Sequence, residues 1–356
     1  MTGTTSSVRW AGAPADWPAD VVKHLLSHPE NGPFGTPQWY QLMAREVDFG
    51  AAARKDALVL ERGGAVQMVM PMVMQGSTWR PLANYYCPLA VPAGASAAGA
   101  ADWGAVFSGI AAQRPRPATL QLGPWPAELA HRPEVLQEAK RAGFWVDSHF
   151  RFGNWYWAVD SSWPTYWQSR PSALRNTVQR KGRQLARAGG RIEIFTAGAD
   201  IERGLAAFQA VYADSWKSAE PHPGFIPGLI RLAAQQGWLR LGVAWLADEA
   251  VAAQLWLVHG GQAHIYKLAY RERHADLGAG SLLTAALMQH VLEVDSVREV
   301  DYGMGDEPYK QAWTPQRRAR WALACQNYST LTGAARAART LVLRNLATIR
   351  AEQEKQ

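Results

Sequence analysis

The stretch that decides the fold is residues 262–318, QAHIYKLAYRERHADLGAGSLLTAALMQHVLEVDSVREVDYGMGDEPYKQAWTPQRR. Its first part is an apolar strand that ends at Tyr270, and a glycine-containing turn follows. The apolar spacing after the turn predicts a helix over 281–294 capped by Ser281, and then a strand over 298–302. Glycines let backbone N–H groups approach an anion closely, and a helix N-terminus favours negative charge. The stretch therefore predicts a phosphate cradle made of Leu277, Gly278, Ala279, Gly280 and Ser281.

The same stretch argues against two other nucleotide-binding folds. No Gly-Lys-Ser/Thr follows the glycines, so the turn is not a Walker loop. The glycines come after several strands that look antiparallel, whereas a Rossmann fold opens on its glycine turn. Many helices also begin after a glycine turn for structural reasons alone, and that alternative stays open.

Outward from the cradle, two hairpins share one outline. Residues 57–74 and residues 237–258 each read as an apolar strand, a turn with an acidic residue and a following valine, and a second apolar strand. This weak internal repeat predicts a duplicated α/β protein with mixed sheets. The expected divisions are a loose segment over 1–30, an N-terminal domain over 31–155, a C-terminal domain over 156–330 and an amphipathic helix over 331–356.

The positive charge is concentrated in one segment. The 356-residue chain has 37 Lys and Arg against 30 Asp and Glu, a net charge of +7. Residues 170–191 carry seven basic residues and no acid, which equals the whole excess. A helix over 172–188 would pack through its apolar side and expose arginines on the other. Two interpretations remain: a helix that binds an anion, and a basic face that is only solvated. We favour the first, because no acidic residue at i±4 relieves the repulsion among the basic side chains.

Composition restricts the remaining classes of site. Hydrophobic residues make up 48% and charged residues 19%, which excludes a disordered chain. Two cysteines cannot form a disulfide framework or a cysteine zinc site, and the histidines lack metal-ligand spacing, so we expect no metal. Because the sequence shows neither a signal peptide nor a long apolar run, we expect a cytoplasmic protein. The C-terminal helix should pack on a domain, with peripheral membrane contact as the alternative.

A family resemblance rests on motifs in the second half of the chain. The residues of the pattern D-Y-G-M-G…Y-K-x-x-W are Asp301, Tyr302, Gly303, Gly305, Tyr309, Lys310 and Trp313. The pattern resembles the end of the CelD-like acetyltransferases of the GNAT superfamily, which are relatives of the Fem-type aminoacyl transferases that build peptidoglycan cross-bridges. The basic helix from Ser172 to Leu185, the segments Val251–Leu255 and Tyr266–Tyr270, and the weaker Pro37–Trp39 resemble the same group. The cradle departs from the GNAT pattern (Q/R)-x-x-G-x-(G/A) at its first position, where this chain has Ala275.

The resemblance implies a fold and an activity. The fold would be two tandem GNAT-like domains, each a mixed, mostly antiparallel sheet flanked by helices. The activity would be transfer of an acyl group from an activated donor to an amine or hydroxyl, with acyl-CoA such as acetyl-CoA as co-substrate and no tightly bound cofactor. Acyl carrier protein is the alternative carrier. The acceptor would be a small molecule or glycan precursor related to the cell envelope, an exopolysaccharide or an amino acid, and no DNA partner is expected.

Candidate residues follow from the needs of acyl transfer. An amine of pKa ~10.4 must lose a proton, and a developing oxyanion must be stabilised. Asp301 is the leading candidate for the base or for orienting the acceptor, with a turn-capping aspartate as the alternative. Lys310 would stabilise the oxyanion or a donor phosphate. Tyr309, Tyr270 or Tyr266 would return a proton to the leaving thiolate. The predicted substrate-binding residues are Arg175, Arg180, Arg183, Tyr266 and Trp313.

Two other functions compete with acyl-CoA-dependent transfer. A tRNA-dependent aminoacyl transferase of the Fem type would use the basic helix to contact RNA. A non-catalytic module would use the same helix to hold nucleic acid or an anionic glycan.

Overall fold

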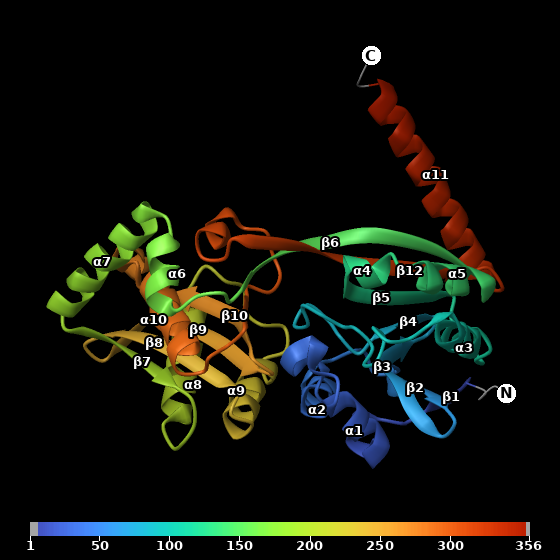
Figure 1. The fold of residues 1–356 in the computed structure, drawn as a ribbon, viewed down its shortest axis with the longest axis horizontal. Helices are drawn as coiled ribbons and strands as arrows, with labels where there is room; N and C mark the ends of the chain where they lie inside the picture. The colour runs from blue at the N-terminus through green and yellow to red at the C-terminus, as the bar shows by residue number, and fades with distance from the viewer. Residues whose placement is uncertain (1–5, 354–356) are drawn as a thin grey trace. The chain divides into compact units, whose positions relative to one another are not determined.

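The computed structural model describes residues 6–353, with side chains through residue 342, and divides them into two compact units (Figure 1). Unit 1 comprises residues 6–151 and 319–353, and unit 2 comprises residues 152–318. The chain passes from unit 1 into unit 2 within strand β6 (Phe144–Ala158), and it returns within β12 (Gln316–Asn327).

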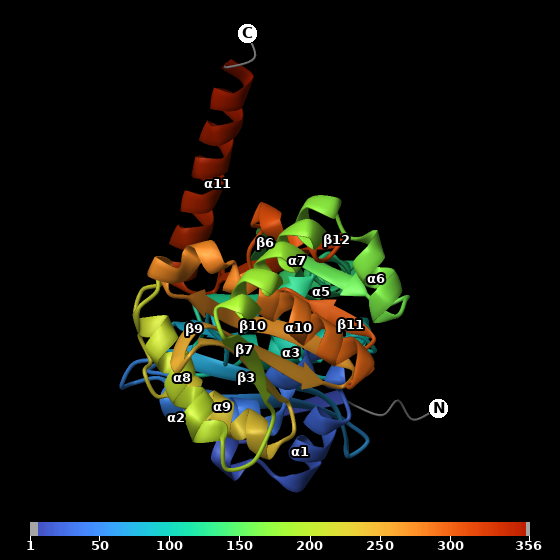
Figure 2. The ribbon, with the colours of Figure 1, turned by 90° about the vertical axis from the view of Figure 1, so that its left-hand side faces the viewer.

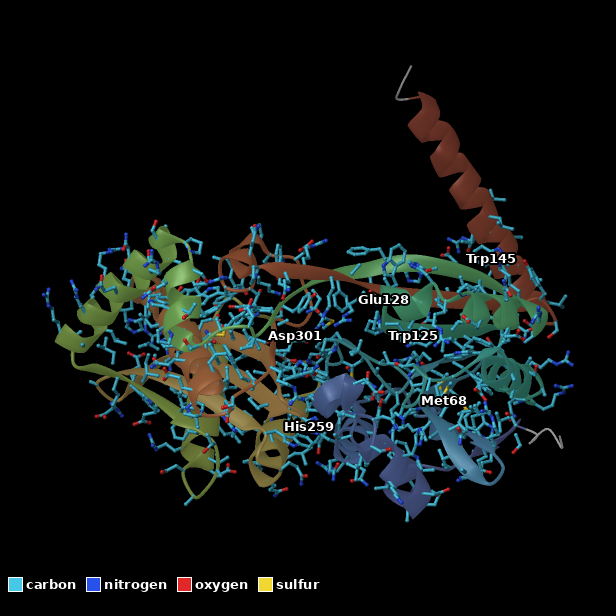
Figure 3. The ribbon with its side chains drawn as sticks, viewed as in Figure 1. Met68, Trp125, Glu128, Trp145, His259 and Asp301 are labelled. Atoms are coloured by element: carbon cyan, nitrogen blue, oxygen red, sulfur yellow. The ribbon has the colours of Figure 1, made fainter. Side chains whose placement is uncertain are left out.

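Unit 1 contains a mixed sheet whose strand order is β1-β2-β3-β4-β5-β12. Neighbouring strands are antiparallel except for the parallel pair β4–β5. The strand bounds are β1 (Ser6–Trp10), β2 (Arg54–Arg62), β3 (Ala65–Gln75), β4 (Thr78–Pro81) and β5 (Thr119–Pro126). Side chains such as Met68 and Trp125, labelled in Figure 3, fill a fully buried core between this sheet and its helices.

The helices of unit 1 begin where the sequence supplies caps. Thr36 accepts a hydrogen bond from the amide of Trp39 at 3.2 Å, and Pro37 occupies the first position of α2. The helix bounds are α1 (Ala19–Leu26), α2 (Pro37–Glu46), α3 (Ala100–Ala111), α4 (Ala127–Ala130), α5 (Pro133–Arg141) and α11 (Leu331–Gln353). The expectation of a loose segment over 1–30 is wrong for its described part, because β1 pairs with β2 and α1 buries Val21 and Leu25.

Unit 2 contains a second mixed sheet, with strand order β6-β11-β10-β9-β8-β7. Its own strands are β7 (Gly190–Phe195), β8 (Leu239–Leu246), β9 (Glu249–His259), β10 (Gln262–Tyr270) and β11 (Glu299–Asp301). Its helices are α6 (Trp163–Ser169), α7 (Ser172–Arg187), α8 (Ile201–Ala213), α9 (Phe225–Gln235) and α10 (Ala279–Glu293). These bounds lie close to the elements that apolar periodicity predicts for this half.

The helices of unit 2 cover both faces of its sheet (Figures 1 and 2). A Cβ at Gly204 on α8 would meet Leu241 of β8, whereas one at Gly242 would meet Leu283 and Leu287 of α10. Successive strand residues point to opposite faces, so α8 and α10 lie on opposite sides of the sheet. Helices α6 and α7 share an apolar core with α10.

The two units repeat one topology. In each, three antiparallel strands lead to a fourth, a helix crosses over to a fifth strand parallel to the fourth, and a sixth strand pairs antiparallel with the fifth. The sixth strand of unit 2 is β6, which follows β5 in the chain, and the sixth strand of unit 1 is β12, which follows β11. The expected C-terminal domain over 156–330 therefore ends too late, because residues from 319 onward belong to unit 1.

The last helix, α11, lies within the expected range 331–356. Its first turns contact unit 1, where Ala337 is fully buried and the guanidinium of Arg336 donates to Thr119 Oγ1 at 2.7 Å. Leu341 and Val342 are exposed, and Figure 1 shows the helix extending away from the unit 1 sheet. Contact with a membrane surface stays a prediction.

Candidate active site

A cleft of about 570 Å³ opens in unit 2 where two parallel strands stop pairing. β11 pairs with β10 only from Glu299 to Asp301, opposite residues 262–264. β10 continues to Tyr270, so among the described residues its second half has no strand partner on the β11 side. The walls of the cleft are this part of β10, the first turns of α10, residues 216–217 and segment 302–313.

A β-bulge in β10 turns several consecutive side chains toward this cleft. The register with β9 shifts between Ile265 and Lys267, so Tyr266 is the extra residue of the bulge. A regular strand sends alternate residues to opposite faces, but a bulge disrupts that alternation. Ile265, Tyr266 and Lys267 consequently all line the cleft.

The glycine turn faces the cleft as the sequence predicts. Gly278 has a left-handed backbone with φ of +61° and forms the N-cap of α10, so the helix begins at Ala279 and Ser281 lies inside its first turn. The predicted capping role of Ser281 is therefore wrong. The amides of Ala279 and Gly280 have no protein acceptor among the described residues. Leu277 packs into an apolar cluster, and the four cradle residues that line the cleft are Gly278, Ala279, Gly280 and Ser281.

A buried glutamine holds the first turns of α10 in place. Gln254 of β9 donates through Nε2 to the carbonyl of Gly280 at 2.8 Å and to Thr284 Oγ1 at 2.9 Å. Its Oε1 accepts from Trp256 Nε1 at 2.9 Å. A satisfied buried network of this kind fixes the geometry of the groups that it joins. The sequence analysis missed Gln254, although one glutamine within the apolar run VAAQLWLV was a usable signal.

Lys310 lines the cleft and shapes the loop before it. Its Nζ donates to the carbonyls of Met304 at 2.7 Å and Gly305 at 3.2 Å, and it pairs with Glu307 at 2.8 Å. The residue is 4% exposed. Through these contacts Lys310 fastens segment 302–307, and its side chain lines the cleft.

Asp301 does not lie among the residues that line the cleft, and its carboxylate is engaged elsewhere. Oδ1 accepts from Asn154 Nδ2 at 2.8 Å and from the amide of Gly303 at 2.6 Å, and Oδ2 pairs with Arg318 at 2.5 Å. Figure 3 labels the residue at the end of β11. The acid caps a turn and balances an arginine, which favours the turn-capping alternative, and the role as base stays an untested prediction.

Four tyrosines line the cleft, of which the sequence analysis proposed three as acids. Tyr309 is 48% exposed, and burial of its hydroxyl together with the Glu307 charge raises its pKa to about 12. The ring of Tyr270 lies 4.5 Å from that of Trp216, and Tyr266 is the bulged residue. Tyr302, the fourth tyrosine, was not proposed as an acid from the sequence.

Tyr302 is almost fully buried, yet its hydroxyl is poorly satisfied. It points toward the Thr284 hydroxyl without forming a hydrogen bond of ordinary geometry. Burial, followed by the nearby hydroxyls of Tyr309 and Tyr166, raises its pKa well above the usual value. The group therefore stays protonated at neutral pH and can donate a hydrogen bond into the cleft.

Comparison with known proteins identifies this half of the chain. Residues 172–311 match the family described as the acetyltransferase (GNAT) domain. Residues 172–311 form a GNAT acetyltransferase domain. The match confirms the resemblance drawn from the C-terminal motif, and the cleft lies almost wholly within these residues. No curated protein sequence matches the chain significantly.

Solved structures extend the fold assignment over nearly the whole chain. FemX aligns with a TM-score of 0.60 at 10% identity, covering 85% of this chain and 94% of FemX. The C-terminal domain of a protein assigned as a lysylphosphatidylglycerol synthetase from Agrobacterium fabrum gives 0.55 at 15% identity, covering 91% and 97%. A tandem GNAT protein from the clavulanic acid biosynthesis pathway gives 0.51 at 16%, covering 90% and 98%. These likenesses confirm the tandem α/β fold.

The GNAT domain brings two further lysines into the cleft. Lys217, in the segment after α8, is partly buried, and burial followed by the charge of Lys267 lowers its pKa. Lys267 pairs with Glu220 at 2.6 Å. Lys217 belongs to no motif, Lys267 lies within the segment Tyr266–Tyr270, and neither was predicted as a site residue, because each reaches the cleft through a separate element.

The arginines predicted to bind substrate do not line the cleft of the GNAT domain. Arg180 and Arg183 border a separate open hollow on α7, and the Nε of Arg175 donates to the carbonyl of Arg170 at 3.2 Å. α7 instead contacts the glycine turn through Lys181, whose ammonium donates to the carbonyl of Asp276. Trp313 and Tyr266, the other predicted substrate-binding residues, do line the cleft.

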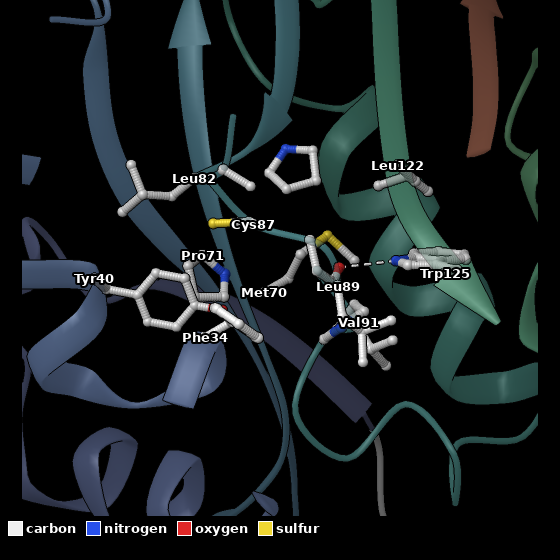
Figure 4. Close-up of a pocket in the computed structure, with 14 residues that line it drawn as sticks. Phe34, Tyr40, Met70, Pro71, Leu82, Cys87, Leu89, Val91, Leu122 and Trp125 are labelled. Atoms are coloured by element: carbon white, nitrogen blue, oxygen red, sulfur yellow. Dashed lines mark hydrogen bonds between the residues drawn. The ribbon is translucent and has the colours of Figure 1, made fainter. Parts of the chain in front are cut away.

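The equivalent helix of unit 1 begins differently. α3 corresponds to α10 in the repeated topology, but the side chain of Asp102 closes its N-terminus by accepting from the amide of Gly99 at 3.0 Å. Asp102 also pairs with Arg62. A cavity of unit 1, shown in Figure 4, holds about 10 Å³, room for one water. A carboxylate at the start of α3 would repel a phosphate, so this helix does not offer the open first turn that α10 has.

Other reactive groups lie outside the cleft. Cys87 and Cys325 belong to unit 1, and burial raises the pKa of each thiol to about 12. Among residues 6–353, no cluster of three or more histidine, cysteine or acidic side chains is arranged to hold a metal. Within the same residues, no helix is both long enough and apolar enough to cross a bilayer.

Proposed function

We propose that this chain moves an acyl group from the thioester of acyl-CoA, or of an acyl carrier protein, to an amine or hydroxyl of a small acceptor. The observation that carries the proposal is the pair of unengaged amides at Ala279 and Gly280, which open onto a cleft bordered by an unpaired strand edge.

The donor would lie along the cleft from α10 toward segment 302–310. Its diphosphate would bind the first-turn amides, where the helix dipole adds ~0.3 to 1 kcal/mol per charge. The pantetheine arm of CoA carries two amides, and the free edge of β10 offers matching N–H and C=O groups. The thioester would then reach the end of the cleft that holds Tyr302 and Lys310.

The reaction there needs three events. A C–N or C–O bond forms as the acceptor attacks the thioester carbonyl, the C–S bond breaks, and the acceptor proton ends on the sulfur. Glu307 is the carboxylate that lines the cleft, and it would orient an ammonium acceptor and accept its proton during attack. The Lys310 ammonium would stabilise the oxyanion, and the Tyr302 hydroxyl would donate a hydrogen bond to the leaving thiolate.

The test is calorimetric titration of the whole chain with acetyl-CoA, a long-chain acyl-CoA and CoA itself. Micromolar binding of an acyl-CoA, followed by release of free CoA in the presence of an acceptor, supports the proposal. Absence of CoA binding together with normal folding would contradict it. The buried Cys87 and Cys325 thiols allow the released thiol to be measured with a thiol reagent under native conditions.

A Fem-type aminoacyl transfer from charged tRNA is the second candidate. The observation that favours it is the exposed row of Arg180, Arg183 and Arg187 on α7, on a fold similar to FemX. Neutralising all three arginines should then weaken RNA binding and flatten its salt dependence, because each phosphate contact adds to the slope. If acetyl-CoA binds and RNA does not, this candidate fails.

A further inference from the structure

The end of the cleft near segment 302–310 carries more positive than negative charge. Three lysines line the cleft, against one lining carboxylate, that of Glu307. Lys310 pairs with Glu307, and Lys267 pairs with Glu220. Among the described residues, Lys217 has no ion pair within 4.0 Å and no hydrogen bond from its Nζ, although it is partly buried. The Lys217 ammonium lies 5.4 Å from the centroid of the Trp216 ring, a contact that does not neutralise its charge, so this position fits an anion brought by a ligand.

The electrostatic surroundings of Lys217 place it at this end of the cleft. The groups that act on it are the ammonium of Lys267 on β10, the carboxylates of Glu307 and Glu220, and the ammonium of Lys310. The two positive groups and burial outweigh the two carboxylates, and the pKa of Lys217 is lowered. Lys217 therefore lies near the charged groups of β10 and of residues 307 and 310.

We propose that Lys217 and Lys267 form a subsite for a carboxylate or phosphate group on the acceptor. This inference rests on the proposed acyl transfer, and it assigns the acceptor to anionic amines or alcohols such as amino acids and phosphorylated amines. Trp216 and Tyr309 line the same cleft with rings that are 46% and 48% exposed. These rings offer apolar contact to the rest of the acceptor while the two ammonium groups hold its anionic end.

The anion that binds these lysines could also belong to the phosphates of the donor. The experiment distinguishes a donor phosphate from an anionic group on the acceptor. Trace acetylation with acetic anhydride, followed by peptide mass spectrometry, measures the accessibility of each lysine in the whole chain. Lys140, an exposed lysine of unit 1, is the internal reference. The probes are inorganic phosphate and succinate, each compared with sodium chloride at the same ionic strength, with and without saturating CoA.

Phosphate or succinate should slow labelling of Lys217 at least fivefold relative to Lys140, both in free protein and with CoA bound. Lys267→Gln should reduce this protection at least fivefold, whereas Lys23→Gln, at another exposed lysine of unit 1, should not change it. The proposal is overturned if neither anion protects Lys217 beyond sodium chloride, or if CoA alone protects it fully, since the subsite would then belong to the donor.

Calorimetric titration with acetyl-CoA on the same samples keeps the two proposals separate. If acetyl-CoA binds but no anion protects Lys217, the anionic acceptor is wrong and acyl transfer stands. If phosphate protects Lys217 but acetyl-CoA does not bind, the anion subsite stands and the proposed donor is wrong. Thermal melting of Lys267→Gln confirms that loss of protection does not reflect unfolding.

Discussion

Replacing Gly280 by alanine tests the cradle, because stability and donor affinity should move in opposite directions. Gly280 lies in the first turn of α10 and lines the cleft. A Cβ built there meets only Tyr270 Cδ1, at 3.8 Å, which is an ordinary contact. Its φ is not positive, so alanine fits without strain. A glycine-to-alanine change within a helix stabilises a protein by about 0.5 to 1 kcal/mol.

The same methyl group would stand where the diphosphate is proposed to approach the amides of residues 279 and 280. Loss of one hydrogen bond to a charged group costs about 1.5 to 3 kcal/mol. That loss corresponds to a rise in the Kd for acetyl-CoA of about ten- to a hundredfold. The assays are calorimetric titration with acetyl-CoA and urea unfolding of the same preparations.

Gly182→Ala is the matched control. Gly182 lies inside α7, outside the cleft lining, and its Cβ would meet only Leu282 Cδ2 at 3.8 Å. We expect a similar gain in stability and an unchanged Kd. If Gly280→Ala binds acetyl-CoA as tightly as the wild type, the diphosphate does not approach these amides, and the assignment of the donor site is refuted.

Four further changes test roles near segment 301–310. Asp301→Asn should lower the free energy of unfolding by about 2 kcal/mol, because the pairing of its carboxylate with Arg318 is buried. Turnover by the folded variant should stay within about threefold of wild type. A tenfold loss in kcat would instead support the role of Asp301 as a base. Lys310→Met should lower turnover at least tenfold, and a wild-type rate would show that Lys310 takes no part in the reaction. Tyr302→Phe should leave the Kd for acetyl-CoA unchanged and lower kcat, and an unchanged kcat would exclude the acid role. Burial is the largest single influence on Glu307 and opposes its ionisation, but the hydrogen bond with Lys310, a backbone hydrogen bond and the charges of Lys310 and Lys217 together outweigh it and lower the pKa below 4.5. The stabilising effect of this pair is then present above pH 4.5 and lost as pH falls through the lowered pKa, which pH-dependent melting of wild type and Glu307→Gln would show.

Local patterns predicted the elements that surround the site. The helix after the glycine turn and the strands before it follow from apolar periodicity, which each segment carries by itself. The start of α10 was predicted two residues late, because Gly278 takes a left-handed backbone and serves as the N-cap in place of a serine side chain. A sequence pattern does not reveal which of the two arrangements a turn adopts.

The roles of charged residues were harder to predict. Asp301 occupies the expected position in the motif, but Asn154 and Arg318, from two other strands, engage its carboxylate. Lys217 belongs to no motif, Gln254 is the variable position of the segment Val251–Leu255, and each reaches the cleft from a different element. Such contacts join residues far apart in the chain, so their partners become visible only when the strands are aligned.

By itself, the sequence determined that a strand, a glycine turn and a helix occur in that order and that a GNAT motif follows, since these depend on neighbouring residues. Tertiary structure alone decided that β6 completes the sheet of unit 2 and β12 that of unit 1, because pairing between distant strands depends on the whole chain. It also decided that the turn opens on a cleft in unit 2, while Asp102 closes the equivalent helix in unit 1. A side chain's effect on a helix end depends on what packs around that end, and local sequence does not specify those neighbours.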